Sequence, residues 1–177
     1  MEKRQQILEG ASKVISERGL HRLTLDAVAK ECNMSKAGLI HHFPSKEALI
    51  TAMNKQVADR FTESIDQAND QEPSYNKAYL KGSIEELNAP KMLNVSNSLL
   101  AAIATNPELI QPWRQSYEEM DEKMKQEGIS EELSSIIRLV SDGLWFANMF
   151  DLQPLSKQEQ ENVKAWLSAC VDREKRN

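Results

Sequence analysis

The sequence predicts an all-α fold made of a small three-helix head and a larger helical body. Aromatic residues make up only 6% of the 177-residue chain, and glycine and proline number six each, so the frequent turns of all-β architectures are missing. Apolar residues account for 40% of the chain, which is enough for one core or for a head joined to a body. Long segments with apolar residues at helical spacing favour helices throughout.

Caps and breakers divide the chain into about nine predicted helices. Their approximate ranges are residues 2–18, 25–33, 36–43, 45–68, 74–87, 90–105, 107–126, 131–150 and 156–173. Gly19 follows the first helix as a C-terminal stop, and Thr24 is a good N-cap for the second. Pro44 prevents the third helix from continuing, and the fourth is long enough to link head and body.

The chain shows no membrane or export segment. Its longest apolar stretches, residues 99–104 and 144–150, are far shorter than the ~18 to 20 residues that a membrane-spanning helix needs. The N-terminus lacks the apolar core of a signal peptide, so we expect a soluble, cytoplasmic protein with no membrane partner. Cys32 and Cys170 each lie in an apolar-periodic segment, and we expect buried thiols without a disulfide.

Charge is distributed unevenly along the chain. The net charge of −5 by itself argues against nucleic-acid binding, which draws its affinity from Lys and Arg. Residues 1–60, however, carry ten Lys or Arg and seven Asp or Glu, a net charge of +3, whereas residues 61–177 carry −8. This asymmetry fits an electrostatic footprint confined to the N-terminal end.

The second and third predicted helices have the spacing of a helix-turn-helix. Such a motif needs a small residue where the helices cross, a residue tolerant of the left-handed conformation four positions later, and an apolar residue six positions further on. Ala29, Asn33 and Leu39 meet these requirements. Leu39 and Phe43 would then point inward, which leaves the opposite face of the third helix free to enter a major groove.

The stretch LTLDAVAKECNMSKAGLIHHFPSKEAL, residues 23–49, resembles the head of TetR family transcriptional regulators. That head typically reads Thr, a few residues, Ala, a Gly-led turn, Leu-Tyr-x-His-Phe, one residue, then Ser-Lys-Glu-x-Leu. The likeness covers about Lys3 to Val57, and the body matches only in helical layout and length. There are two departures. Asn33 replaces the usual Gly, and Ile40 replaces a Tyr that bonds a phosphate, so Ile40 would touch a thymine methyl or simply pack.

The resemblance implies a DNA-binding domain over residues 1–47 and an effector-binding and dimerisation domain over residues 48–177, with the helix 45–68 as the connecting lever. It implies double-stranded DNA as a partner. The expected DNA-binding residues are Thr24, Ser35, Lys36, Ala37, Gly38, Ile40, His41 and Lys46. Lys36 would reach a base edge or a phosphate, and His41 and Lys46 would bind phosphates. The alternative is that Thr24 and Ser35 are only caps and Lys46 a solvated charge.

The last two predicted helices each carry an apolar band. The resemblance implies that these bands form a four-helix homodimer interface, and the alternative is that they bury against the protomer's own core. The expected interface residues are Leu133, Ile137, Val140, Leu144, Val163, Trp166, Leu167 and Cys170.

Large adaptable side chains in the body suit a pocket for a small apolar or aromatic effector, although ordinary core packing explains them nearly as well. The expected effector-binding residues are Met92, Trp113, Tyr117, Met120, Trp145 and Met149. An acidic run over residues 118–122 could instead select a cation if one carboxylate faced inward, but such a run is usually a solvated face.

An enzyme is not expected. The sequence has no phosphate-binding glycine loop, no HExxH, no CxxC and no triad, so we expect neither a metal nor a cofactor. A helical partner-binding protein without DNA affinity stays open as an alternative. The resemblance implies a repressor in which an effector shifts the spacing of two heads and releases a palindromic operator.

Overall fold

The computed structural model describes residues 3–88 and 106–176, and every regular element in these ranges is helical. The predicted all-α class is therefore confirmed. The chain divides into two compact units. The first holds described residues 3–58 and 106–115, and the second holds 59–88 and 116–176. The head boundary predicted near residue 47 stays a prediction.

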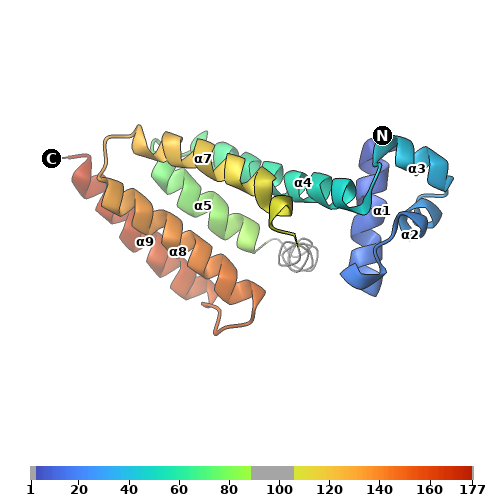
Figure 1. The fold of residues 1–177 in the computed structure, drawn as a ribbon. Helices are drawn as coiled ribbons and strands as arrows, with labels where there is room; N and C mark the ends of the chain where they lie inside the picture. The colour runs from blue at the N-terminus through green and yellow to red at the C-terminus, as the bar shows by residue number, and fades with distance from the viewer. Residues whose placement is uncertain (1–2, 89–105, 177) are drawn as a thin grey trace. The chain divides into compact units, whose positions relative to one another are not determined.

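The first unit is built on α1 (Lys3–Arg18), α2 (Leu25–Glu31) and α3 (Lys36–His42), which lie together in Figure 1. The buried residues of α1 recur at helical spacing, as predicted. They are Ile7, Leu8, Ala11, Val14 and Ile15. Gly19 ends α1 with φ at 78°, a conformation that costs glycine little. The predicted crossover at residues 20–23 is a short 3-10 helix, Leu20–Arg22.

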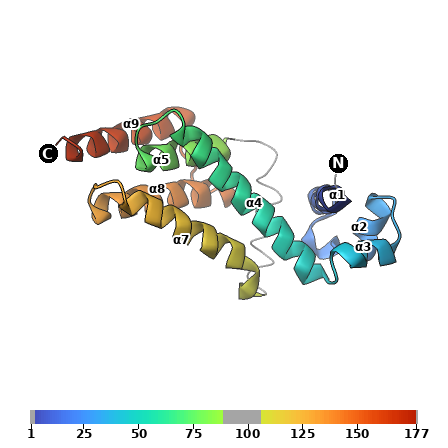
Figure 2. The same ribbon diagram turned by 90° about the horizontal axis from the view of Figure 1, so that it is seen from above.

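The turn between α2 and α3 forms as the sequence predicts (Figure 2). Asn33 adopts φ of 51°, and the Met34 N–H donates to the carbonyl of Ala29 at 2.9 Å. These contacts end α2 at Glu31, two residues before the predicted end, because a left-handed residue cannot continue an α-helix. Ala29 is 3% exposed, consistent with a close crossing of the two helices.

Helix α4 (Lys46–Asn69) begins in the first unit and ends in the second. Ser45 caps it by accepting a hydrogen bond from the Ala48 N–H at 3.0 Å. In the first unit, the buried Asn54 amide donates to the carbonyl of Leu109 at 3.0 Å. This bond fixes a 3-10 helix, Pro107–Ile110, to the start of α4.

The structure divides the helix predicted over residues 107–126 into two elements, the 3-10 helix and α7 (Gln111–Lys125). The helix predicted over residues 90–105 lies outside the described residues. Eight α-helices are described in the remaining ranges. None of these helices combines the length and the apolar character that a membrane-spanning helix requires.

Helix α5 (Tyr75–Leu87) is the central element of the second unit. It packs against α8 (Glu131–Met149) and α9 (Lys157–Glu174). It also crosses the end of α4 closely, because a Cβ at Gly82 would lie 2.8 Å from the Cα of Ile65. Only glycine fits at this crossing without a shift of backbone.

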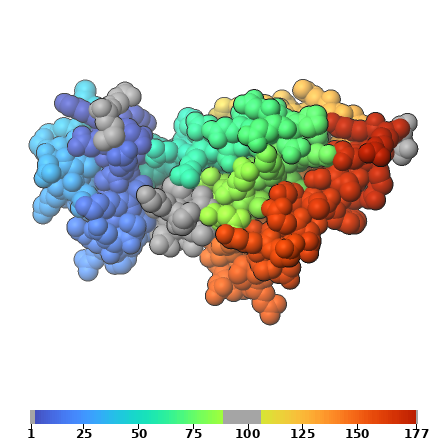
Figure 3. Space-filling model, turned by 180° about the vertical axis from the view of Figure 1, so that it is seen from behind, coloured from blue at the N-terminus to red at the C-terminus, as the bar shows by residue number. Residues whose placement is uncertain are grey.

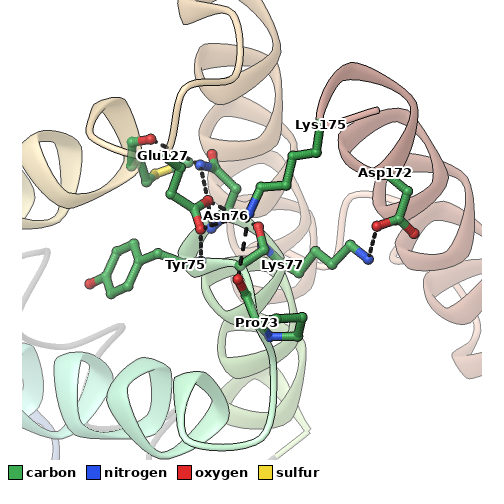
Figure 4. A network of polar contacts seen from close by, with 9 residues as sticks. Pro73, Tyr75, Asn76, Lys77, Glu127, Asp172 and Lys175 are labelled. Atoms are coloured by element: carbon green, nitrogen blue, oxygen red, sulfur yellow. Dashed lines mark hydrogen bonds and ion pairs between the residues drawn. The ribbon is translucent and has the colours of Figure 1, made fainter. Parts of the chain in front are cut away.

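The N-terminus of α5 is anchored by Glu127, which follows α7 (Figure 4). Its carboxylate accepts hydrogen bonds from the Ser74 hydroxyl at 2.9 Å, the Asn76 N–H at 2.9 Å and the Asn76 side-chain amide at 2.7 Å. It also accepts from the Tyr75 N–H and lies 3.3 Å from Lys175 Nζ. One carboxylate thus satisfies the free N–H groups of a helix start and ties α5 to the end of α9.

Candidate functional site

The outer face of α3 is the strongest candidate for a binding surface. Leu39 and Phe43 are 0% and 1% exposed, so the predicted inward face is confirmed. The predicted outward positions lie on the exposed side of the helix. These are Lys36, Ala37, Gly38, Ile40 and His41. Ile40 is 39% exposed, so its side chain is accessible and is not part of the core.

Both helices of the pair begin with a hydroxyl cap. Thr24 accepts a hydrogen bond from the Ala27 N–H at 3.1 Å, and Ser35 accepts one from the Gly38 N–H at 3.1 Å. A hydroxyl that accepts one bond keeps its own proton for donation. Thr24 and Ser35 are both exposed, so the cap role and the proposed contact with DNA are compatible.

Lys36 already has an anionic partner. Its Nζ lies 2.8 Å from Asp26 Oδ2, and the two side chains are 54% and 58% exposed. An exposed pair of this kind contributes little to stability, but Lys36 must leave Asp26 before it can bind a phosphate or a base. Sequence reasoning missed Asp26, although it stands in the first turn of the helix that precedes the turn.

Basic side chains also lie at the C-terminal side of α3. Lys46 is half-buried in the first turn of α4, and His41 is exposed. The Arg4 guanidinium lies 4.5 Å from the centre of the Phe43 ring, a cation–π contact that holds a further positive charge here. Arg4 was not among the predicted residues, because its place depends on how α1 packs against α3.

The predicted effector-binding residues do not all lie in the same unit. Trp113 packs against the hydrophobic core of the first unit, and Met92 lies outside the described residues. The remaining four belong to the second unit. These are Tyr117, Met120, Trp145 and Met149. Met120 and Met149 are buried, whereas Tyr117 and Trp145 are half-buried.

A polar cluster lies inside the second unit, and sequence reasoning found only one of its members. We call it the tyrosine cluster, and it consists of Tyr75, Tyr79, Tyr117, Arg138 and Asp142. The Tyr117 hydroxyl donates to Asp142 Oδ1 at 2.6 Å. Burial raises the pKa of the Asp142 carboxyl, against the hydrogen bond from Tyr117 and the charge of Arg138. The periodicity of α5 and α8 gives no signal that distinguishes these polar side chains from an ordinary helix surface.

The acidic run of α7 behaves as a solvated face. Glu118, Glu119 and Glu122 are exposed. Asp121 forms an ion pair with Lys125 at 2.7 Å. No carboxylate of this run is deeply buried, which favours the solvated alternative over a cation-selecting one.

The predicted dimer residues fall on two sides of their helices. Leu133, Ile137, Leu144 and Leu167 are buried in the protomer's own second unit, at 7%, 0%, 9% and 1% exposure. Val140, Val163 and Cys170 are half-buried, and Trp166 is 64% exposed. These four buried side chains already have packing partners within the protomer, as the alternative of burial in the protomer's own core expects.

A different apolar row is exposed on these helices, which lie side by side on the surface of the second unit (orange and red in Figure 3). On α8 and just beyond it the row comprises Ile136, Leu139, Phe146, Phe150 and Leu152, each between 47% and 63% exposed. Trp166 extends it on α9. Helix α8 therefore carries two apolar stripes at helical spacing, one buried (Leu133, Ile137 and Leu144) and one exposed. Only packing against α5 decides which of the two faces the interior.

Comparisons with known proteins agree with this arrangement. Residues 7–53 match the model of bacterial regulatory proteins of the tetR family, and residues 73–172 match the tetracyclin repressor-like C-terminal domain. The second match covers more than half of the chain.

Two curated relatives are transcriptional regulators. The repressor AcnR of Corynebacterium efficiens is 25% identical over 122 residues, which is 69% of this chain and 62% of that protein. The regulator UidR of Escherichia coli K12 is 44% identical over 57 residues, 32% of this chain and 29% of that protein. The chain thus spans less than two thirds of the length of these relatives.

Among solved structures, the multidrug binding protein EbrR complexed with malachite green has a TM-score of 0.76 at 19% identity, covering 94% of this chain and 98% of that one. At this identity the likeness shows the fold alone. The helix-turn-helix geometry and the two family matches together lead to one conclusion. The chain belongs to the TetR family of DNA-binding transcriptional regulators, a family whose members are not enzymes.

Proposed function

We propose that the protein is a ligand-responsive repressor that binds a palindromic operator as a homodimer and leaves it when a small effector occupies the body. The observation that carries this proposal is the exposed face of α3, presented by the left-handed turn at Asn33. A helix held this way fits the major groove of duplex DNA. A regulator of this kind acts where the DNA is, which in a bacterium is the cytoplasm.

The homodimer is supported by the exposed apolar row of α8 and α9. Six large apolar side chains between 47% and 64% exposed on neighbouring segments form a patch of the kind that marks protein interfaces. Gly143 lies on the same helix, and a Cβ there would meet nothing within 4 Å, so a second helix can approach closely. In this proposal the row replaces most of the interface residues that the family resemblance suggested.

Dimerisation is tested by light scattering after size-exclusion chromatography. Phe146→Glu together with Trp166→Glu should convert a dimer to a monomer, because charges cannot be buried at an apolar interface without partners. Lys157→Glu is the matched control, since it adds the same negative charge on α9 at an exposed position. A wild-type protein that runs as a monomer at every concentration would contradict the proposed dimer.

DNA binding is tested by selecting duplexes from a random library with the full chain and measuring their affinity at several salt concentrations. Affinity should fall steeply as salt rises. Lys46→Ala should weaken binding to all duplexes and flatten the salt dependence, whereas Lys36→Ala should change the preference among sites. Lys157→Ala should change neither.

The alternative function is a helical adaptor that binds a protein partner without affinity for DNA. It predicts no retention of any duplex at low ionic strength and no effect of the Lys36 or Lys46 variants. Either result would remove the DNA-binding face from this proposal.

A further inference from the structure

We infer that the tyrosine cluster binds the effector and selects a small aromatic molecule carrying a hydrogen-bond acceptor, such as a carboxylate. This inference rests on the proposed function, in which the body senses a ligand, and it adds the chemical class of that ligand. It adds polar groups to the pocket for an apolar or aromatic molecule that the sequence suggested.

The five side chains come from three helices of the same unit. Tyr75 and Tyr79 are four residues apart on α5, and Arg138 and Asp142 are four residues apart on α8, so each pair shares one face of its helix. Helices α5 and α8 pack directly against each other. Tyr117 of α7 joins them through its hydrogen bond to Asp142.

The cluster contains hydrogen-bond donors that the described residues do not satisfy. Tyr79 and Tyr75 are 0% and 8% exposed. Within the described parts of the chain, the Tyr75 hydroxyl has no hydrogen-bond partner, and the same holds for Arg138 Nε, which is buried as well. The Tyr79 hydroxyl faces that of Tyr117. Buried polar atoms in folded proteins are nearly always paired, because an unpaired one costs stability. Two such atoms in one cluster point to a ligand that completes them.

The cluster lacks a hydrogen-bond acceptor for these donors. An arginine Nε–H can only donate, and Asp121 Oδ1 lies 3.9 Å from it, beyond hydrogen-bonding distance. The Asp142 carboxylate is already engaged by Tyr117. Burial also raises the pKa of Tyr75 and Tyr79, so both phenols stay protonated and able to donate. A ligand carboxylate or carbonyl matches this set, whereas an ammonium group would add a further donor.

Aromatic side chains lie beside the polar groups of the cluster. The Tyr79 ring packs edge-on against Phe61 with 6.0 Å between centroids, and this arrangement is typical of aromatic packing. Trp145 is half-buried three residues beyond Asp142 on α8. A ligand joining the donors of α5 to Arg138 of α8 would favour one packing of these two helices, which is what an effector must do to shift a conformational equilibrium.

The inference is tested with three probes that share one ring system: 1-naphthoate, 1-naphthylmethanol and 1-naphthylmethylamine. Binding to the full chain is measured by calorimetry, and thermal stability is measured in parallel. We expect naphthoate to bind most tightly and the amine most weakly. Arg138→Gln should weaken naphthoate binding at least about tenfold, because hydrogen bonds to charged groups are the strong ones. Arg176→Gln, an exposed position, should leave binding unchanged.

Two conservative variants separate ligand binding from a structural role. Tyr75→Phe removes a hydroxyl that has no hydrogen-bond partner within the described residues, and Tyr79→Phe removes the hydroxyl that faces Tyr117. Each should weaken naphthoate binding about fivefold. Tyr75→Phe should not lower the melting temperature of the ligand-free protein, and a small rise is expected because an unpaired buried group is removed. A hydroxyl with only a structural role would lower the melting temperature.

Three results would overturn the inference. The first is that the amine binds most tightly and loses its affinity in Asp142→Asn, which would show a cation site. The second is that none of the three probes binds at concentrations up to about 1 mM. The third is that Tyr75→Phe destabilises the ligand-free protein while naphthoate binding stays intact. The DNA-binding assay on the same samples keeps the two proposals apart. Retention of duplex DNA without probe binding refutes only this inference, and probe binding without DNA retention refutes only the regulator.

Discussion

Replacing Glu127 by alanine should destabilise the protein by about 2 to 3 kcal/mol. The Glu127 side chain is only 14% exposed and accepts hydrogen bonds from Ser74, Tyr75 and Asn76 at the start of α5. A hydrogen bond to a charged group contributes roughly 1.5 to 3 kcal/mol and a helix cap about 1 kcal/mol, without simple additivity. One such bond and one cap together give roughly 2.5 to 4 kcal/mol, and we expect a somewhat smaller loss because the carboxylate keeps some contact with solvent.

The assay is urea unfolding at fixed protein concentration, followed by circular dichroism, with thermal unfolding alongside. For a chain of this size the loss corresponds to a melting temperature lower by about 4 to 12 °C. Glu85→Ala is the matched control, since it removes the same charge from an exposed position of α5 itself. Equal stability of the two variants would refute the reasoning that Glu127 anchors this helix.

The same carboxylate gives a pH dependence with a definite sign. Burial alone would raise the pKa of Glu127, but the hydrogen bonds from Asn76, Tyr75 and Ser74 outweigh it and lower that pKa. The folded-state pKa therefore lies below the unfolded value of about 4.3. The stabilisation is fully present above that value and is lost as pH falls through the folded pKa. The stability difference between wild type and Glu127→Ala should shrink below about pH 4, and a difference that grows there would contradict this account.

Three further predictions concern other parts of the molecule. Asp26→Asn should raise affinity for duplex DNA about threefold, because Lys36 loses its competing partner; fluorescence anisotropy measures this, and weaker binding would show that Asp26 positions Lys36. Gly82→Ala should destabilise the protein by about 1 to 3 kcal/mol, because the new Cβ would meet the Ile65 backbone; unchanged urea unfolding would mean that the crossing relaxes. Ile40→Tyr should strengthen binding to every duplex about fivefold by adding a phosphate contact, and an effect limited to certain sequences would place residue 40 against bases.

Local features of the head could be predicted well from sequence. The turn at Asn33 and the inward position of Leu39 follow from the backbone preferences and spacing of adjacent residues. The ends of α2 and α3 differ from the predicted ones by one or two residues, because caps and the left-handed turn decide where hydrogen bonding stops. The spacing did not reveal Asp26 or Arg4, whose positions depend on side-chain contacts between helices.

In the body, helical periodicity does not predict which helices cover each apolar face. Helix α8 carries two apolar stripes, and the predicted interface took Leu133, Ile137 and Leu144, which pack inside the protomer. A helical spacing reports that a face is apolar but not which partner covers it. In α5 and α8, the polar side chains of the tyrosine cluster stand at ordinary helical positions. Their chemistry arises only when α5, α7 and α8 bring them together.

The sequence by itself determined the all-α class, the helix-turn-helix and the face of α3 that points outward, because these depend on residues within about ten positions of one another. Only the tertiary structure decided which stripe of α8 is buried, how Glu127 holds the start of α5, and that the buried Tyr75 hydroxyl and Arg138 Nε lack hydrogen-bond partners among the described residues. These features join segments about 50 or more residues apart, and the packing of whole helices, which no local preference encodes, sets their contacts.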